Sequence, residues 1–202
     1  MKPLFLLLAA LVGSCMGPDG SAAPLRAHTL DLPPGCRPEG PAVRRQCTVP
    51  ADGYGRVITV WQNAQRFDQA FDDPQAKRAA LARDPASFWA ATLRTSEENG
   101  RAALQPDYAI RHADMRAFPP PAGAEACIWF EIDATEVATG RNGESRGIRC
   151  ALYDPASDVT EEFGIDFIGF PPLGAPPDPT LAADAERAAR SLRFAPPGAA
   201  GE

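Results

Sequence analysis

The sequence predicts an α+β fold, in which an antiparallel sheet has its helices packed on one face as a two-layer sandwich. Three observations predict this fold. Several runs rich in β-branched and aromatic residues are separated by turn residues. Two Asp-Pro pairs each precede a run of good helix formers. The dipeptide Asn142-Gly143, which favours a two-residue hairpin turn, lies between two of the strand-like runs.

The first half of the domain is predicted to form a strand and then helices. Residues 56–62 (RVITVWQ) follow the turn residues Asp52-Gly53 and favour a strand. Asp73-Pro74 and Asp84-Pro85 each combine a capping carboxylate with proline at the first helical position, which predicts two helix starts.

The helix after Asp84 is predicted to face the core. Trp89 and Leu93 lie four residues apart on one side, while Arg94 and Glu97 are expected to point elsewhere. Asn99-Gly100 is expected to end this helix.

A run of strands follows, and its hairpin is the clearest signal. Residues 108–118 favour a strand, residues 126–138 and 146–154 flank Asn142-Gly143, and residues 161–170 form one more strand. A turn at Asn142-Gly143 sets Glu136 opposite Arg149, an opposite-charge pair that would stabilise the sheet. The same register sets Cys127 opposite Asp158.

The chain closes with a helix opened near Asp178-Pro179, whose residues Leu181, Ala185, Ala188 and Leu192 share one stripe. It ends in Ser191-Leu192-Arg193-Phe194. This pattern resembles the PsbP/Mog1-like fold, in which a closing helix with a Ser-Leu-x-Phe-like end packs back on the sheet. The resemblance covers residues 47–194 and implies an adaptor or accessory protein more often than an enzyme. It brings no universal site.

The N-terminus has the layout of a secretory signal, with Lys2 before an apolar run that is too short to cross a bilayer. Val12-Gly13-Ser14-Cys15 then resembles the lipobox of bacterial lipoproteins. The resemblance implies that Cys15 receives a lipid and becomes the new N-terminus. Because Met16 follows and not Asp, it also implies the outer membrane. The competing cleavage site is Ser21-Ala22-Ala23, far behind the apolar run.

These features predict four segments. A signal peptide covers residues 1–14, and a lipidated cysteine with a flexible tether covers residues 15–35. A single domain covers residues 36–194, and a disordered tail covers residues 195–202.

The four cysteines that remain, Cys36, Cys47, Cys127 and Cys150, suggest two disulfides in an oxidising compartment. Sequence proximity favours Cys36 with Cys47 and Cys127 with Cys150. The Asn142-Gly143 register, however, separates Cys127 from Cys150 by about 26 Å along the strand, far beyond the bridging limit of about 7 Å.

Composition argues against several partners and cofactors. The net charge of -6 gives no basis for binding nucleic acid. No cysteine pair has metal-site or redox spacing, and only His28 and His112 supply imidazole, so we expect neither a metal nor another cofactor. The expected partners are the membrane, through the lipid, and an unidentified protein or small molecule.

Two residues are candidates for catalysis, although we expect no enzyme. Ser145 lies in Gly143-Glu144-Ser145-Arg146-Gly147, which matches G-x-S-x-G, but a strand follows it where an esterase needs a helix. His112 has acidic neighbours but no evident nucleophile. A small periplasmic hydrolase using Ser145 or His112 is therefore the alternative to a non-catalytic binding module.

The hairpin also offers a binding face. Ile128, Phe130, Ile132 and Ala134 form the more apolar side, where the helices carrying Trp89 and Leu192 are expected to pack. The opposite side would then expose a tryptophan beside three carboxylates, a candidate surface for a basic partner that consists of Trp129, Glu131, Asp133 and Asp154.

Overall fold

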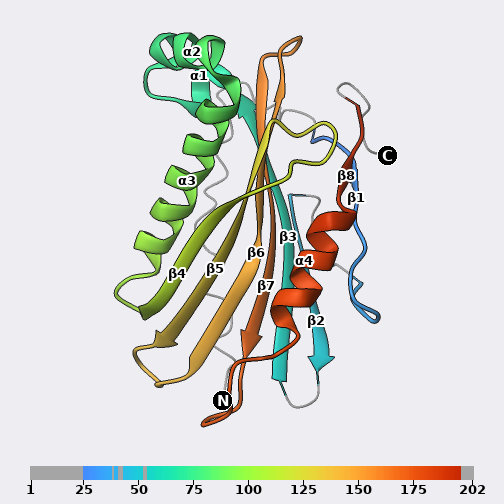
Figure 1. The fold of residues 1–202 in the computed structure, drawn as a ribbon, viewed down its shortest axis with the longest axis vertical. Coiled ribbons are helices and arrows are strands. Elements are labelled where there is room, and N and C mark those ends of the chain that lie inside the picture. Colours follow the sequence, from blue (N-terminus) through green and yellow to red (C-terminus); the bar gives the residue numbers. More distant parts are fainter. Residues whose placement is uncertain (1–24, 38, 41–42, 52–53, 197–202) are drawn as a thin grey trace.

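The computed structural model describes residues 25–37, 39–40, 43–51 and 54–196. A six-stranded antiparallel sheet, a separate two-stranded sheet and four helices make up this part of the chain (Figure 1). The predicted α+β class is confirmed. The elements in chain order are β1 (His28–Thr29), β2 (Arg44–Ala51), β3 (Tyr54–Arg66), α1 (Phe67–Ala70), α2 (Pro74–Arg83), α3 (Pro85–Leu104), β4 (Tyr108–Phe118), β5 (Ala126–Glu136), β6 (Asn142–Asp154), β7 (Val159–Phe170), α4 (Leu181–Ser191) and β8 (Arg193–Phe194).

The large sheet has the strand order β2-β3-β7-β6-β5-β4. Side chains alternate between its two faces, so each strand supplies two separate apolar sets. One set, which we call the α3 face, includes Ile128 and Ala151 and packs with Trp89 and Leu93 of α3. The other, the α4 face, includes the next residue along each of these strands and packs with α4.

The sequence suggested that the helices pack on one face of the sheet, and this is wrong. Helices α3 and α4 cover opposite faces (Figure 1). Trp89 packs over Ile128 as expected, but Leu192 packs on the Trp129 side. The reason is that both faces of β5 and β6 are apolar along much of their length, with Trp129, Ile148 and Leu152 each at most 1% exposed. Two apolar faces require two covering layers.

The predicted Asp caps are confirmed at α2 and α3. Asp73 accepts from the backbone N–H of Ala76 at 3.0 Å, and Asp84 accepts from that of Ser87 at 3.1 Å. The predicted end of α3 is wrong, because the helix continues through Asn99-Gly100 to Leu104. Glu97, which was expected to point away from the core, is also buried on the core side of α3. Its carboxylate lies 3.1 Å from the guanidinium of Arg149.

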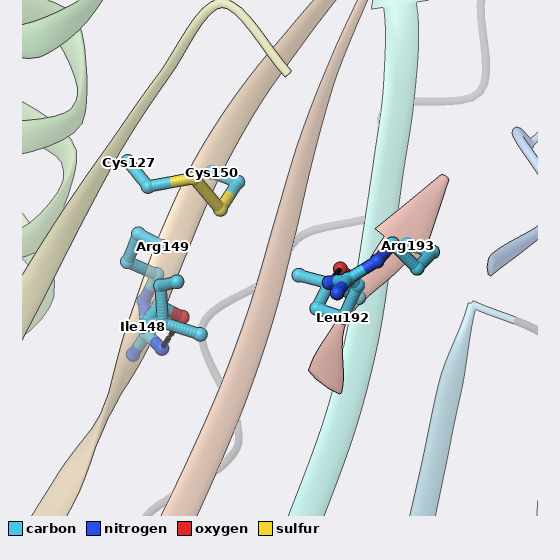
Figure 2. The surroundings of a disulfide bond; sticks show 6 residues. All are labelled: Cys127, Ile148, Arg149, Cys150, Leu192 and Arg193. Atoms are coloured by element: carbon cyan, nitrogen blue, oxygen red, sulfur yellow. Dashed lines mark hydrogen bonds between the residues drawn. A yellow bond between two sulfur atoms is a disulfide. The ribbon is translucent and has the colours of Figure 1, made fainter. Parts of the chain in front are cut away.

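The hairpin turn between β5 and β6 lies at residues 137–141, where Gly140 has φ +70°, and not at Asn142-Gly143. Asn142 begins β6 opposite Thr135. Arg149 consequently lies opposite Ile128, and Cys127 lies opposite Cys150, not Asp158. The doubt that the earlier register cast on Cys127–Cys150 is removed, because these cysteines form a disulfide with a Cα–Cα distance of 4.2 Å (Figure 2). Cys36 and Cys47 form the second disulfide.

The fold begins earlier than the composition predicts. Residues 25–36, which we call the N-terminal arm, lie within the expected tether except for Cys36, yet β1 pairs with β8 and Arg26 is buried. The arm packs Leu30 and Leu32 against the core on the α4 face. The predicted signal peptide, Cys15 and most of the expected tail lie outside the described residues. Within the described ranges, no helix is long and apolar enough to cross a membrane.

Candidate functional site

A strip of polar side chains crosses β4, β5 and β6 on the α4 face. In an antiparallel pair, directly opposite residues share a face. The register sets His112 of β4 opposite Asp133 and sets Asp114 opposite Glu131. It also sets Arg146 of β6 opposite Glu131 and sets Glu144 opposite Asp133. We call this set the polar strip; its members are His112, Asp114, Glu131, Asp133, Glu144 and Arg146.

Helix α4 leaves part of the polar strip open to solvent. It packs against β6 and β7, so it lies to one side of β4 and β5. The side chains of Glu131 and Asp133 are 31% and 24% exposed, whereas that of Arg146 is 11% exposed. The strip therefore presents carboxylates above a buried cation.

Arg146 organises the strip. Its guanidinium lies 2.7 Å from Asp133, 3.4 Å from Glu131 and 3.8 Å from Glu144. It also donates to the backbone carbonyl of Ile132 at 2.9 Å. Because three carboxylates surround one guanidinium, the strip keeps a net negative charge.

The strip continues beneath the start of α4. Glu144 accepts from the backbone N–H of Asp178 at 2.8 Å, and burial raises the pKa of its carboxyl group against the opposing effect of this bond and of Arg146. Asp178 in turn accepts two hydrogen bonds from Arg56, at 2.6 and 2.7 Å, and Arg56 also pairs with Asp184 of α4. These contacts connect the polar strip to the loop before α4.

The predicted binding face is only partly assembled. Trp129 is 1% exposed, so it cannot present its ring to a partner. Its indole N–H donates to Glu131 at 2.9 Å, while Phe118 stacks on the ring and Arg116 lies over it. Asp154 lies elsewhere, opposite Val159, where it accepts from Ala156 in the β6–β7 turn. Glu131 and Asp133 are brought together as expected, but by Arg146.

Ser145 and His112 lie on opposite faces of the sheet. Ser145 is opposite Ile132, which shares the α3 face with Ile128 and Phe130. His112 is opposite Asp133 on the α4 face and is exposed. A nucleophile and its base must approach within hydrogen-bond distance, so these two residues cannot form such a pair.

A second charged cluster lies beneath α3 and was not predicted. Arg149 of β6 lies 3.1 Å from Glu97 and 2.7 Å from Asp166, and its guanidinium lies 4.2 Å from the ring centre of Phe130 and 5.0 Å from that of Trp61. Figure 2 shows this side chain beside the Cys127–Cys150 bridge. The spacing of Glu97, four residues after Leu93 and eight after Trp89, was the signal that could have placed it on the buried side.

Glu162 completes the cluster beneath α3. Its two carboxylate oxygens accept from the hydroxyl of Ser96 at 3.1 and 3.0 Å. Burial raises the pKa of Glu162 and also that of Glu97. Because two rings and two carboxylates enclose Arg149, its guanidinium has little surface left to contact a ligand.

A site for a small ligand or a metal would need a pocket or a cluster of ligating side chains. A shallow hollow of about 230 Å³ lies where β1 meets β8, between His28, Arg193 and Phe194. Pockets for small molecules usually enclose about 300–1,000 Å³. Among the described residues, no three His, Cys, Asp or Glu side chains are placed to hold a metal ion.

Comparisons with known proteins assign no family. No family model matches the chain, and no curated protein matches it. Among solved structures, a match is the crystal structure of LpqN involved in cell envelope biogenesis of Mycobacterium tuberculosis, at 14% identity and a TM-score of 0.45, covering 87% of this chain and 91% of that chain. A likeness at this level carries no conclusion about function. The PsbP/Mog1-like resemblance stays a prediction, although Leu192 and Phe194 of its terminal motif are buried in the core.

Proposed function

We propose that this chain is an exported lipoprotein, held at the cell envelope through a lipid on Cys15, whose domain is a non-catalytic accessory module that binds a partner. One observation carries the proposal. The described cysteines are all paired, as Cys36–Cys47 and Cys127–Cys150, which leaves Cys15 as the odd member of the five. That odd cysteine is the one at the end of the lipobox-like sequence.

The disulfides support export independently of the lipobox. Disulfides persist in oxidising compartments and are rare where thiols are kept reduced. Cys127 and Cys150 lie directly opposite each other in the sheet, and both are buried. The predicted signal peptide and the paired cysteines therefore point to the same side of the membrane.

The polar strip supports binding in preference to catalysis. Its carboxylates, of which Asp114 is exposed and Glu131 and Asp133 are partly exposed, suit a basic surface of a partner, because complementary charges steer an encounter and fix its orientation. The hydrolase alternative needs a base for Ser145 or a nucleophile for His112, and these residues lie on opposite faces.

Lipidation is tested by intact-mass analysis of the full chain extracted from bacterial membranes. We expect a diacyl or triacyl mass on a chain that begins at Cys15. Cys15→Ser should abolish both the added mass and the membrane association. The matched control is Ser21→Ala, which changes the competing cleavage site and should leave the lipidated product intact. A wild-type product that is soluble and begins near Pro24 would overturn the proposal.

A further inference from the structure

We infer that the outer edge of β4 is a self-association surface, where β4 of a second copy of this chain pairs antiparallel about a two-fold axis at Met115. The inference does not depend on the lipidation of Cys15. Strand β4 lies at one margin of the six-stranded sheet, and among the described residues no strand pairs with its outer edge (Figure 1). Its 11 residues make this edge a template for pairing with another chain.

The opposite edge of the sheet is partly covered, which distinguishes it from β4. Beside β2, Glu39 and Gln46 exchange two backbone hydrogen bonds, at 3.0 and 2.8 Å. Strand β2 also contains Pro50, which has no N–H to donate. Strand β4 contains no proline, and its one register shift lies in its first half, before His112. Residues 113–118 therefore form a regular segment that is able to pair.

The backbone of β4 presents alternate residues to this edge. Along β5, the N–H of Glu136 points toward β6, because it donates to Arg141 at 2.9 Å. Successive residues of a strand point their N–H and C=O groups to opposite sides, so Glu131, five residues earlier, points toward β4. Its partner Asp114 is therefore bonded to β5. By the same alternation, the residues that point their N–H and C=O groups to the outer edge are Ala113, Met115 and Ala117.

Two opposite charges on this segment have no ion-pair partner among the described residues. Asp114 is exposed, and the residue opposite it on β5 is Glu131, another carboxylate. Like charges directly opposite each other destabilise a sheet. Arg116 is also exposed, and its guanidinium lies 5.4 Å from the ring centre of Trp129. A cation beside Asp114 and an anion beside Arg116 would complete both.

A two-fold axis at Met115 supplies both charges. Asp114 of one copy then lies opposite Arg116 of the second copy, and the symmetric pair forms on the other side of the axis. Opposite residues of this kind, which exchange no backbone bonds, have Cα atoms about 4.5 Å apart, close enough for an ion pair. The same axis sets Met115 opposite Met115 and Ala113 opposite Ala117, so that outward-pointing backbone groups meet.

Other positions of the axis lack this complementarity. An axis at Asp114 places two carboxylates opposite each other, and an axis at Arg116 places two guanidinium groups opposite each other. An axis at Ala113 draws the register shift of β4 into the pairing. An axis at Ala117 leaves Asp114 beyond the end of the neighbouring strand. The axis at Met115 is therefore the one that uses both charges.

The covering helices leave this edge accessible. Helix α3 packs mainly on β5 and β6, and α4 packs on β6 and β7. Ala117 is exposed, while Met115 is partly buried against the apolar cluster of the α3 face. An axis perpendicular to the sheet keeps each face on its own side. The two six-stranded sheets would become one continuous sheet, and the two polar strips would meet on its α4 face.

The test measures self-association of the full chain by analytical ultracentrifugation in density-matched detergent. We expect a monomer–dimer equilibrium for the wild type. Asp114→Arg and Arg116→Asp each place like charges across the axis and should weaken dimer formation by at least about tenfold. An equimolar mixture of these two variants pairs Arg with Asp at both positions, so it should associate as the wild type does. Recovery in the mixture also shows that both variants fold. Arg187→Asp, on the exposed side of α4, is the control and should leave the equilibrium unchanged.

Ala117→Pro tests the backbone part of the interface. The N–H of Ala117 points outward, so proline removes a donor from the edge and no bond to β5. We expect this variant to remain monomeric, with a thermal unfolding midpoint near that of the wild type. A wild-type chain that sediments as a monomer overturns the inference, and so does one that carries an extended segment of another protein on this edge. A dimer that persists in Ala117→Pro or in both charge variants, or a mixture that stays monomeric, overturns it as well.

Discussion

Arg149 lies near the rings of Phe130 and Trp61. Its guanidinium forms ion pairs with Glu97 and Asp166. Removing one partner from a buried ion pair costs about 3–5 kcal/mol, because the remaining charges stay out of water. We therefore expect Arg149→Met to lower the free energy of unfolding by that amount in urea denaturation. The control is Arg187→Met, since Arg187 is 68% exposed and should cost less than about 1 kcal/mol. Similar small losses in both variants would show that the cluster is not important for stability.

Glu162 gives the same cluster a pH dependence. Burial raises its pKa, so the native carboxyl group holds its proton to a higher pH than the unfolded one does. The unfolded state then releases its proton first, and this residue's contribution to stability falls as pH rises above the unfolded pKa of about 4.3. Glu97 and Asp166 add to the effect and Arg149 opposes it.

We expect Glu162→Gln to gain stability relative to the wild type between about pH 4 and pH 7, because the amide never ionises. Urea midpoints across this range measure the change. Glu98→Gln, on the exposed side of α3, is the control and should show no pH-dependent difference. A parallel pair of curves for Glu162→Gln and the wild type would refute this assignment.

At the scale of elements, two glycines predict opposite results. Gly100 lies within α3 with nothing near its missing Cβ, so Gly100→Ala should stabilise the helix by up to about 1 kcal/mol. Gly164 of β7 lies under the Trp61 ring, where a Cβ would come within 2.2 Å of it. Gly164→Ala must displace Trp61 and should destabilise the domain by about 1–3 kcal/mol. Thermal unfolding compares the two, and equal shifts would contradict the described packing.

Local chemistry made some elements predictable and left others out of reach. The Asp73 and Asp84 caps and the β-branched runs act through neighbouring residues, so the sequence places them well. The predicted hairpin register was wrong because Asn142-Gly143 matched a turn pattern, whereas the strands are joined by a longer loop that contains Gly140. That error moved every cross-strand partner, including Arg146 and Cys150.

The polar strip shows the same limit. Glu131 and Asp133 were expected to be together because they alternate along one strand. Their cation, Arg146, and the cover over Trp129 depend on pairings between strands, which residue types in one chain do not fix. The burial of Arg149 could not be predicted from the sequence either, since its partners come from α3 and β7.

At the scale of the whole molecule, the layers on the two faces of the sheet determine what a partner can reach. Helix α3 covers one face, and α4 with the N-terminal arm covers much of the other. The part of the polar strip on β4 and β5 stays partly open to solvent.

The pairing of β1 with β8 also has a consequence for biogenesis. His28 and Thr29 are among the first described residues, and their partners Phe194 and Arg193 are among the last. A chain delivered across a membrane from its N-terminus cannot complete this two-stranded sheet until nearly all of it has crossed. Contacts between such distant residues form late, because a long loop must close first. Under the proposed export, this two-stranded sheet would therefore form only after nearly the whole chain has crossed the membrane.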